Sequence, residues 1–289
     1  MAFRHAVLDR NIKAISSLVP CPSPRLSLPM RIALALEYDG RPFCGFQSQP
    51  SACGVQDALQ RVLSSIADGA VGVVPAGRTD AGVHATSQIV HFDTDAHRPL
   101  SAWVRGVNAS LPAQVCVLWS RAVADDFHAR FAASARHYSY LLLARGERPG
   151  LDSGRIGWYH RALDVDAMQR AADRLVGEHD FSSFRSSECQ AKTPVKTLHV
   201  ARVRALGNLI RFDFSANAFL HHMIRNLVGA LVCVGNAQHD DAWVLSLLEA
   251  RDRRAAPATF AADGLYFTGA DYDRRFGLPA TRRDVMLAS

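Results

Sequence analysis

Apolar and polar residues alternate over several short stretches of this chain, which is the pattern of half-buried β-strands. In RIALALEYDG, residues 31–40, Ile32, Leu34, Leu36 and Tyr38 alternate with small or polar residues, and a turn signal ends the run. Further strands are predicted in the same way at 71–74, 87–92, 115–119, 138–142, 198–203, 209–214 and 265–272.

Other stretches carry apolar residues at the spacing of an amphipathic helix. Val55, Leu59, Val62, Leu63 and Ile66 predict a helix between the first strand and the next. Further helices are predicted near 103–111, from about 165 to 176 with Asp164 as the N-cap, at 219–234 and at 242–250.

The order of these elements predicts an α+β fold. Strands that follow one another across short turns favour antiparallel pairing over a doubly wound parallel sheet. The pattern that begins near His137 repeats the earlier one in outline, so we expect two similar halves of mainly antiparallel sheet flanked by helices, with the active-site cleft between them. The expected parts are an N-terminal extension at 1–29, disordered or preceding the true start at Met30, a catalytic half at 30–134 and a second half at 135–280.

Composition narrows the class of protein. The 289 residues can bury a full core, and no apolar run approaches the roughly 18 residues that span a bilayer, so we expect a soluble, cytoplasmic protein. The formal charge of +6 comes mainly from arginine, since lysine occurs only at Lys13, Lys192 and Lys196. Arginine binds phosphate and stacks on bases, which favours an RNA partner, although a GC-rich genome would produce the same bias. Six cysteines without a CxxC pair predict neither a zinc module nor a disulfide framework.

The loop GRTDAGVHA, residues 77–85, presents a single carboxylate, Asp80, between two predicted strands. Gly77 and Gly82 interrupt regular strand structure and let another molecule approach the backbone. Aspartate and glycine are also ordinary turn formers, so an Asp80 that only caps its own backbone is the alternative. Arg78 beside it favours an ionised carboxylate that acts as a nucleophile or stabilises charge.

Residues far from this loop could complete a site. His222 and Arg225 are three positions apart and share one face of a predicted helix. Because the adjacent His221 and His222 would diverge on a helix and lack a third ligand, no metal site is expected. Tyr138 lies on a predicted strand, where it either packs in the core or stacks on a base.

Six segments, in order from about residue 30 to about residue 275, carry a family resemblance. They are EYDGRPFCGFQ (37–47), AGRTDAGVHA (76–85), DFHARFAASARHYSY (126–140), FSSFR (181–185), NAFLHHMIRNLVG (217–229) and DGLYF (263–267). With these segments the chain resembles the bacterial tRNA pseudouridine synthase A family. The resemblance implies the pseudouridine synthase fold, a homodimer, and isomerisation of uridine to pseudouridine at positions 38, 39 and 40 of the tRNA anticodon stem-loop, with no cofactor or metal.

The same resemblance implies a role for each site residue. Asp80 matches the catalytic aspartate, Arg78 matches an arginine that helps to turn the target base out of its stack, and Arg225 matches the basic partner of the aspartate. Tyr138 matches the tyrosine that packs against the base, and Leu265 matches the apolar residue on the pocket floor. Asp80 would attack the ring or C1′, or abstract a ribose proton, and the sequence leaves these routes open.

Two other functions stay open at this point. A non-catalytic RNA-binding or RNA-folding protein would also need the basic balance of this chain. A hydrolase of glycosidic bonds could use Asp80, but such enzymes generally need two cooperating carboxylates, and the sequence offers no obvious second one near it.

Overall fold

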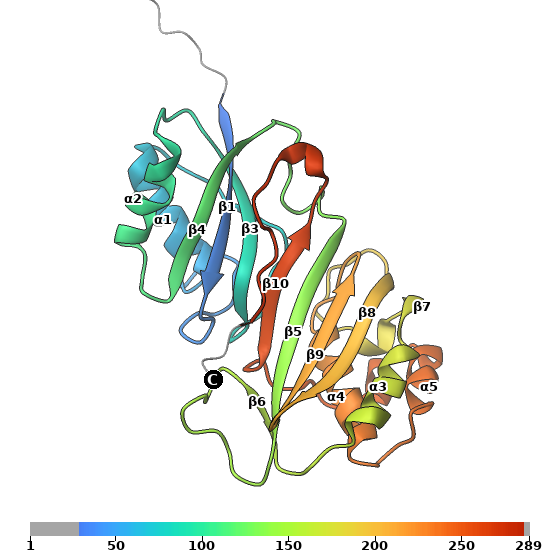
Figure 1. Ribbon diagram of the computed structural model, residues 1–289. Helices are drawn as coiled ribbons and strands as arrows, with labels where there is room; N and C mark the ends of the chain where they lie inside the picture. Colours follow the sequence, from blue (N-terminus) through green and yellow to red (C-terminus); the bar gives the residue numbers. More distant parts are fainter. Residues whose placement is uncertain (1–28, 286–289) are drawn as a thin grey trace, which may run out of the picture.

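The computed structural model describes residues 29–285, so the extension expected at 1–29 lies outside the described residues except for its last position. The strands are β1 (Met30–Tyr38), β2 (Val74–Pro75), β3 (His84–Thr94), β4 (Val115–Val123), β5 (Ala135–Ala144), β6 (Gly157–Tyr159), β7 (Gly177–Asp180), β8 (Val195–Leu206), β9 (Leu209–Ala216) and β10 (Leu265–Asp271). Within the described range they form one ten-stranded sheet in the order β4-β1-β3-β10-β5-β9-β8-β7, with β2 on β3 and β6 on β5 (Figure 1).

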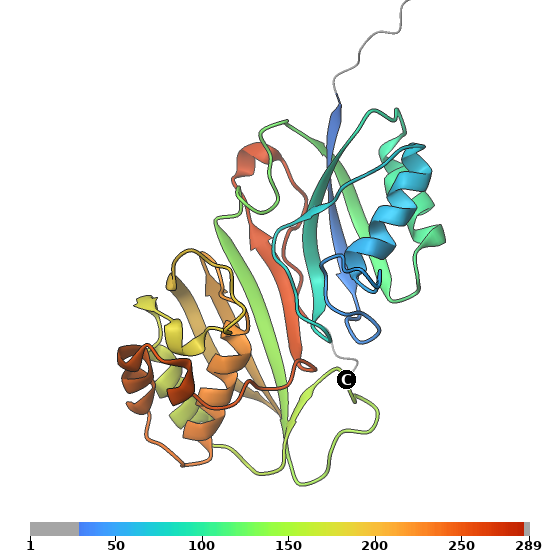
Figure 2. The ribbon, with the colours of Figure 1, turned by 180° about the vertical axis from the view of Figure 1, so that it is seen from behind.

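Most strand pairs in this sheet are antiparallel, and only β10 with β3 and β5 with β6 run parallel in the part of the chain that the structure describes. The helices are α1 (Val55–Ala67), α2 (Arg105–Ser110), α3 (Val165–Asp173), α4 (Met223–Gly235) and α5 (Trp243–Ala250). Figure 2 shows α1 and α2 at one end of the sheet and the other three helices at its other end, all on the same face. This arrangement confirms the predicted α+β class.

Strand β10 comes from near the C-terminal end of the chain but lies in the middle of the sheet. It pairs with β3 through Tyr266 opposite His84, and with β5 through Phe267 opposite Tyr138. The sheets expected for two halves are therefore joined into one. The start of β10 lies beside the end of the loop that carries Asp80.

The boundaries of the helices follow local chemistry. The Asp164 carboxylate accepts the backbone N–H of Ala167 (2.9 Å), which confirms it as the N-cap of α3. The helix predicted at 219–234 begins only at Met223, because His222 before it has a positive φ of 63° that no helix can contain.

The strand predicted at 71–74 is wrong apart from its last residue. The N–H of Val71 donates to Oγ of Ser64 (3.0 Å), and the N–H of Val73 donates to Oε1 of Gln60 (2.9 Å). These backbone groups are thus satisfied by side chains of α1 instead of a neighbouring strand, and only β2 joins the sheet.

The cysteines of the loop between β1 and α1 differ from what composition predicted. Cys44 and Cys53 form a disulfide, with Cα atoms 5.4 Å apart, so the expectation of no disulfide is wrong for this pair. Sequence spacing could not reveal it, because the loop between them folds back on itself: the N–H of Cys44 donates to the carbonyl of Cys53 (3.0 Å). Among residues 29–285, no helix is long and apolar enough to cross a bilayer.

Candidate active site

The loop that carries Asp80 connects β2 to β3, and hydrogen bonds fix its backbone. The N–H of Phe46 donates to the carbonyl of Thr79 (3.0 Å), and the Thr79 hydroxyl shares a hydrogen bond with the hydroxyl of Tyr38 (2.8 Å). Within the loop, the N–H of Val83 donates to the Asp80 carbonyl (3.2 Å). These hydrogen bonds therefore fix the backbone position from which the Asp80 side chain extends.

Three nitrogen-bearing side chains face the Asp80 carboxylate. Nη1 of Arg225 donates to Oδ2 at 3.3 Å, Nε2 of His222 lies 3.3 Å from the same oxygen, and Nε2 of His221 lies 3.2 Å from Oδ1. Within the described residues the carboxylate accepts no backbone N–H, so the alternative in which Asp80 only caps its own turn is wrong. The side chain is 22% exposed, which leaves it within reach of a bound molecule.

His221 and His222 precede α4 instead of lying on it. The left-handed backbone of His222 turns the chain so that both rings face Asp80, with ring centroids 4.0 Å apart. The premise that these residues diverge on a helix without a third ligand is therefore wrong. Their ring nitrogens and an oxygen of Asp80 lie within 4.8 Å of one another. Burial lowers the pKa of His222 below its ordinary value, so neutral imidazole is favoured there.

Tyr138 and Leu265 belong to the neighbouring strands β5 and β10. Tyr138 is 9% exposed, and its ring packs edge-on against Phe219 and Phe267, with centroids 5.1 and 5.0 Å away. Burial raises the pKa of its hydroxyl, which therefore stays protonated. Leu265 is also buried. A Cβ built at Gly77 would lie only 3.7 Å from the Tyr138 hydroxyl, so this part of β5 borders the start of the Asp80 loop.

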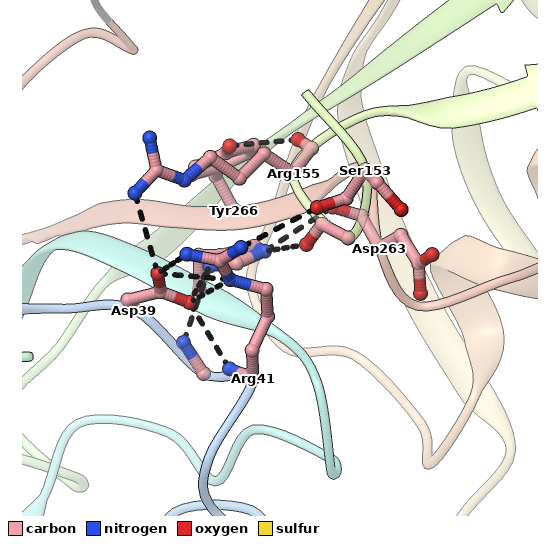
Figure 3. A network of polar contacts seen from close by, with 9 residues as sticks. Asp39, Arg41, Ser153, Arg155, Asp263 and Tyr266 are labelled. Atoms are coloured by element: carbon pink, nitrogen blue, oxygen red, sulfur yellow. Dashed lines mark hydrogen bonds and ion pairs between the residues drawn. The ribbon is translucent and has the colours of Figure 1, made fainter. Parts of the chain in front are cut away.

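A polar network joins the end of the Asp80 loop to the segment before β10 (Figure 3). Nδ1 of His84 accepts the N–H of Gly40 (3.1 Å), so its proton is on Nε2, which lies 3.2 Å from the carbonyl of Asp263. The Asp39 carboxylate lies 3.3 Å from Nδ1 and accepts hydrogen bonds from Arg41. Burial alone raises the pKa of Asp39, but the hydrogen bonds from Arg41 outweigh it and lower that pKa to about 2. Asp39 is therefore ionised and binds Arg41, while His84 joins the loop to the segment before β10 through its own two ring nitrogens.

Comparison with known proteins identifies the family. The sequence profile of tRNA pseudouridine synthases matches residues 34–132 and 171–273. The chain belongs to the tRNA pseudouridine synthase family. It is 60% identical over 252 residues to tRNA pseudouridine synthase A of Chromobacterium violaceum, and the aligned residues cover 87% of this chain and 96% of that protein. It is 55% identical over 257 residues to tRNA pseudouridine synthase A of Dechloromonas aromatica, with 89% and 98% covered. Membership in this family of isomerases confirms the predicted enzyme class.

Arg78 does not lie against the Asp80 carboxylate, although its position in the sequence suggested that contact. Its side chain is exposed, and among residues 29–285 it makes no ion pair with Asp80. Arg225, from the distant helix α4, is the arginine that contacts the carboxylate, and its Nε is held by the carbonyl of Phe260 (2.7 Å). In this member of the pseudouridine synthase family, the ion pair at Asp80 is made across the fold.

The sequence pattern does not indicate the role of the loop between β1 and α1. Gly45 has a φ of +99°, and a Cβ built there would lie 2.8 Å from the carbonyl oxygen of Thr79. This close approach lets the neighbouring Phe46 donate its N–H to the same carbonyl. The only signal in the sequence is a glycine in a loop, which is too common to predict such a contact.

Proposed function

We propose that this chain isomerises uridine to pseudouridine at positions 38, 39 and 40 of the tRNA anticodon stem-loop, with Asp80 as the catalytic nucleophile. The observation that carries the proposal is the Asp80 carboxylate. It is partly exposed, it lies on a fixed loop, and it is contacted by Arg225, His221 and His222. Family membership supports the reaction and the class of RNA. The positions within the tRNA rest on the sequence resemblance.

The reaction requires an anionic group that can reach an extruded nucleotide. The bond from N1 to C1′ breaks, the uracil turns, and a bond from C5 to C1′ forms, while C5 loses its proton and N1 gains one. An enzyme doing this must take the base out of its stack. Nη1 of Arg225 lies 3.3 Å from Oδ2 and places a positive charge beside the carboxylate. An ionised carboxylate is the form that attacks as a nucleophile.

The remaining site residues have complementary roles in this proposal. Arg78 is exposed on the same loop as Asp80, so it can contact the phosphates of the extruded nucleotide and help to hold the base outside the helix. Tyr138 supplies an aromatic ring and a protonated hydroxyl, and Leu265 supplies an apolar side chain. Such groups can bind the detached uracil without reacting with it.

A tritium-release assay tests the proposal. tRNA with tritium at uridine C5 loses that tritium when the C5 to C1′ bond forms, so the wild-type protein should release it and Asp80→Asn should not. Asp95→Asn, which changes an exposed carboxylate outside the site, should release tritium at the wild-type rate. A wild-type protein that binds tRNA without releasing tritium would support the non-catalytic alternative, and free uracil among the products would support the hydrolase. Mapping pseudouridine in the product tRNA tests the three positions.

We also propose a homodimer in the cytoplasm, where its tRNA substrate occurs, and this rests on the family resemblance. Size-exclusion chromatography with light scattering should give twice the chain mass of 31.6 kDa. A mass that stays at one chain across the accessible concentrations would contradict the dimer. Fractionation of cells should recover the protein with the cytosol.

A further inference from the structure

The two histidines beside Asp80 offer a chemistry that uridine isomerisation does not require. Each presents Nε2 to a different oxygen of the carboxylate, at 3.2 Å for His221 and 3.3 Å for His222. Two imidazoles and one carboxylate are a common ligand set for divalent transition metals, with open positions left for water.

The spacing of these atoms is close to that of ligands around a metal ion. Zinc binds imidazole nitrogen and carboxylate oxygen at about 2.0–2.2 Å, so neighbouring ligands of a tetrahedral ion are about 3.3 Å apart. His221 stands at that edge length from Oδ1 and His222 from Oδ2, while one carboxylate oxygen and the two ring nitrogens lie within 4.8 Å of one another. One oxygen and both nitrogens must therefore come closer together to bind a single ion.

The backbone around these ligands is fixed. The carbonyl of His221 accepts the N–H of Ser186 (3.0 Å), and the carbonyl of His222 accepts the N–H of Asn226 in the first turn of α4 (3.0 Å). All three side chains are partly exposed, with exposed fractions of 35%, 26% and 22% for His221, His222 and Asp80, so an ion from solvent can reach them.

We propose that Asp80, His221 and His222 form a binding site for a divalent transition-metal ion of the zinc class, and that a bound ion inhibits the enzyme by occupying its catalytic carboxylate. The inhibitory part rests on the proposed function, whereas binding of the ion does not. Magnesium, which accompanies tRNA, should not bind tightly at this site, because Mg²⁺ prefers oxygen donors and keeps its water shell.

Arg225 opposes the metal and sets its affinity. Its Nη1 lies 3.3 Å from Oδ2, while among the described residues Oδ1 faces only His221. An ion therefore gains most of its carboxylate contact from Oδ1, close to a guanidinium charge that repels it. We expect removal of this charge in Arg225→Gln to increase the affinity for zinc about tenfold, a result that damage to the fold would not produce.

Binding is measured on metal-free full-length protein, by competition of Zn²⁺ with a chromophoric chelator and by the visible spectrum of Co²⁺. One ion per chain is expected, and His221→Asn and His222→Asn should each weaken binding by at least about tenfold, because even outer-shell changes have effects of that size. His97→Asn, an exposed histidine elsewhere, should bind like the wild type. Binding that is absent at up to hundreds of micromolar Zn²⁺, or that the two histidine variants leave unchanged, would overturn the site.

The inhibitory part is tested separately by tritium release. Zn²⁺ should stop the reaction at the concentration that fills the site, a chelator should restore it, and Mg²⁺ should not inhibit. If the metal-free enzyme is active and the filled enzyme keeps its rate, inhibition is wrong. If the metal-free enzyme releases no tritium, the proposed function fails while the binding measurement still decides the site.

Discussion

At the scale of single residues, Arg225 is the arginine that forms an ion pair with the Asp80 carboxylate within residues 29–285. Its Nη1 lies 3.3 Å from Oδ2, and its Nε is anchored to a backbone carbonyl at 2.7 Å. We expect Arg225→Gln to reduce kcat about a hundredfold or more, the size of effect found when one preorganised donor is removed from an active site. Arg225→Lys keeps the charge but not both contacts, so its rate should fall between the two. The tritium-release rate measures this, and thermal unfolding checks that the variants are folded; an unchanged rate for Arg225→Gln would contradict the role.

His91 gives a second residue-scale prediction, for stability. It is 4% exposed, its Nδ1 accepts the N–H of Ala129 (3.1 Å), and burial, with repulsion from His128, lowers its pKa to about 4. The unfolded chain has a histidine pKa of about 6.5, so it binds more protons than the folded chain between these values. Stability from neutral His91 is therefore complete above about pH 6.5 and is lost as the pH falls toward about 4, with a slope of at most about 1.4 kcal/mol per pH unit.

The variant His91→Asn isolates this contribution. Its side-chain oxygen can still accept from Ala129 but does not titrate, so its free energy of unfolding should change less with pH over this interval than that of the wild type. Urea unfolding at several pH values measures both proteins. Parallel pH profiles would show that His91 is not the group responsible.

The residue chemistry of the site could be predicted only where it is local or carried by the family resemblance. The motif around Asp80 indicated a presented carboxylate, and the resemblance named Arg225 as its partner. The convergence of His221 and His222 could not be predicted, because it depends on a positive φ of 63° at a histidine, which no spacing rule signals.

At the scale of elements, the loop between β1 and α1 supports the loop of Asp80 through Gly45. A Cβ there would lie 2.8 Å from the Thr79 carbonyl oxygen, and the φ of +99° strains any other residue. We expect Gly45→Ala to shift the Asp80 loop and reduce kcat about tenfold or more, since misplacement by an ångström costs about a hundredfold. The backbone strain should also lower the free energy of unfolding by about 1–3 kcal/mol.

Gly72→Ala is the matched control for this prediction. It lies in the segment just before β2, and a Cβ built there meets nothing within 4 Å. Its rate should therefore equal that of the wild type. If Gly45→Ala and Gly72→Ala were equally active, the loop between β1 and α1 would have no part in positioning Asp80.

Hydrophobic periodicity predicted most elements because their buried faces repeat at the period of a helix or strand. It failed at 71–74, where the buried Val71 and Val73 imitate a strand but their N–H groups bind side chains of α1. The disulfide between Cys44 and Cys53 was missed for a related reason: loop geometry decides it, and loops carry no period.

At the scale of the whole molecule, the chain crosses between its two parts more than once. The expected division into 30–134 and 135–280 stays a prediction, but β10 from the second part pairs with β3 from the first. After β10 the chain returns across the first part: Nε1 of Trp119 donates to the carbonyl of Ala280 (3.1 Å), and Oγ of Ser87 donates to that of Thr281 (3.0 Å). The order β3-β10-β5 could not be predicted from sequence, because periodicity contains no information on which strands are neighbours.

This crossing connectivity predicts that the described part of the chain unfolds as one cooperative unit. Neither part can keep its share of the sheet without β10, because its loss exposes an edge on both β3 and β5. Native-state hydrogen exchange should therefore give the slowest amides of β1 and β3 the same opening free energy as those of β5 and β9. Residues 30–134 expressed alone should remain unfolded. If amides of one part open at a free energy lower by more than about 2 kcal/mol, or if the fragment folds, the two parts are independent domains that share an edge.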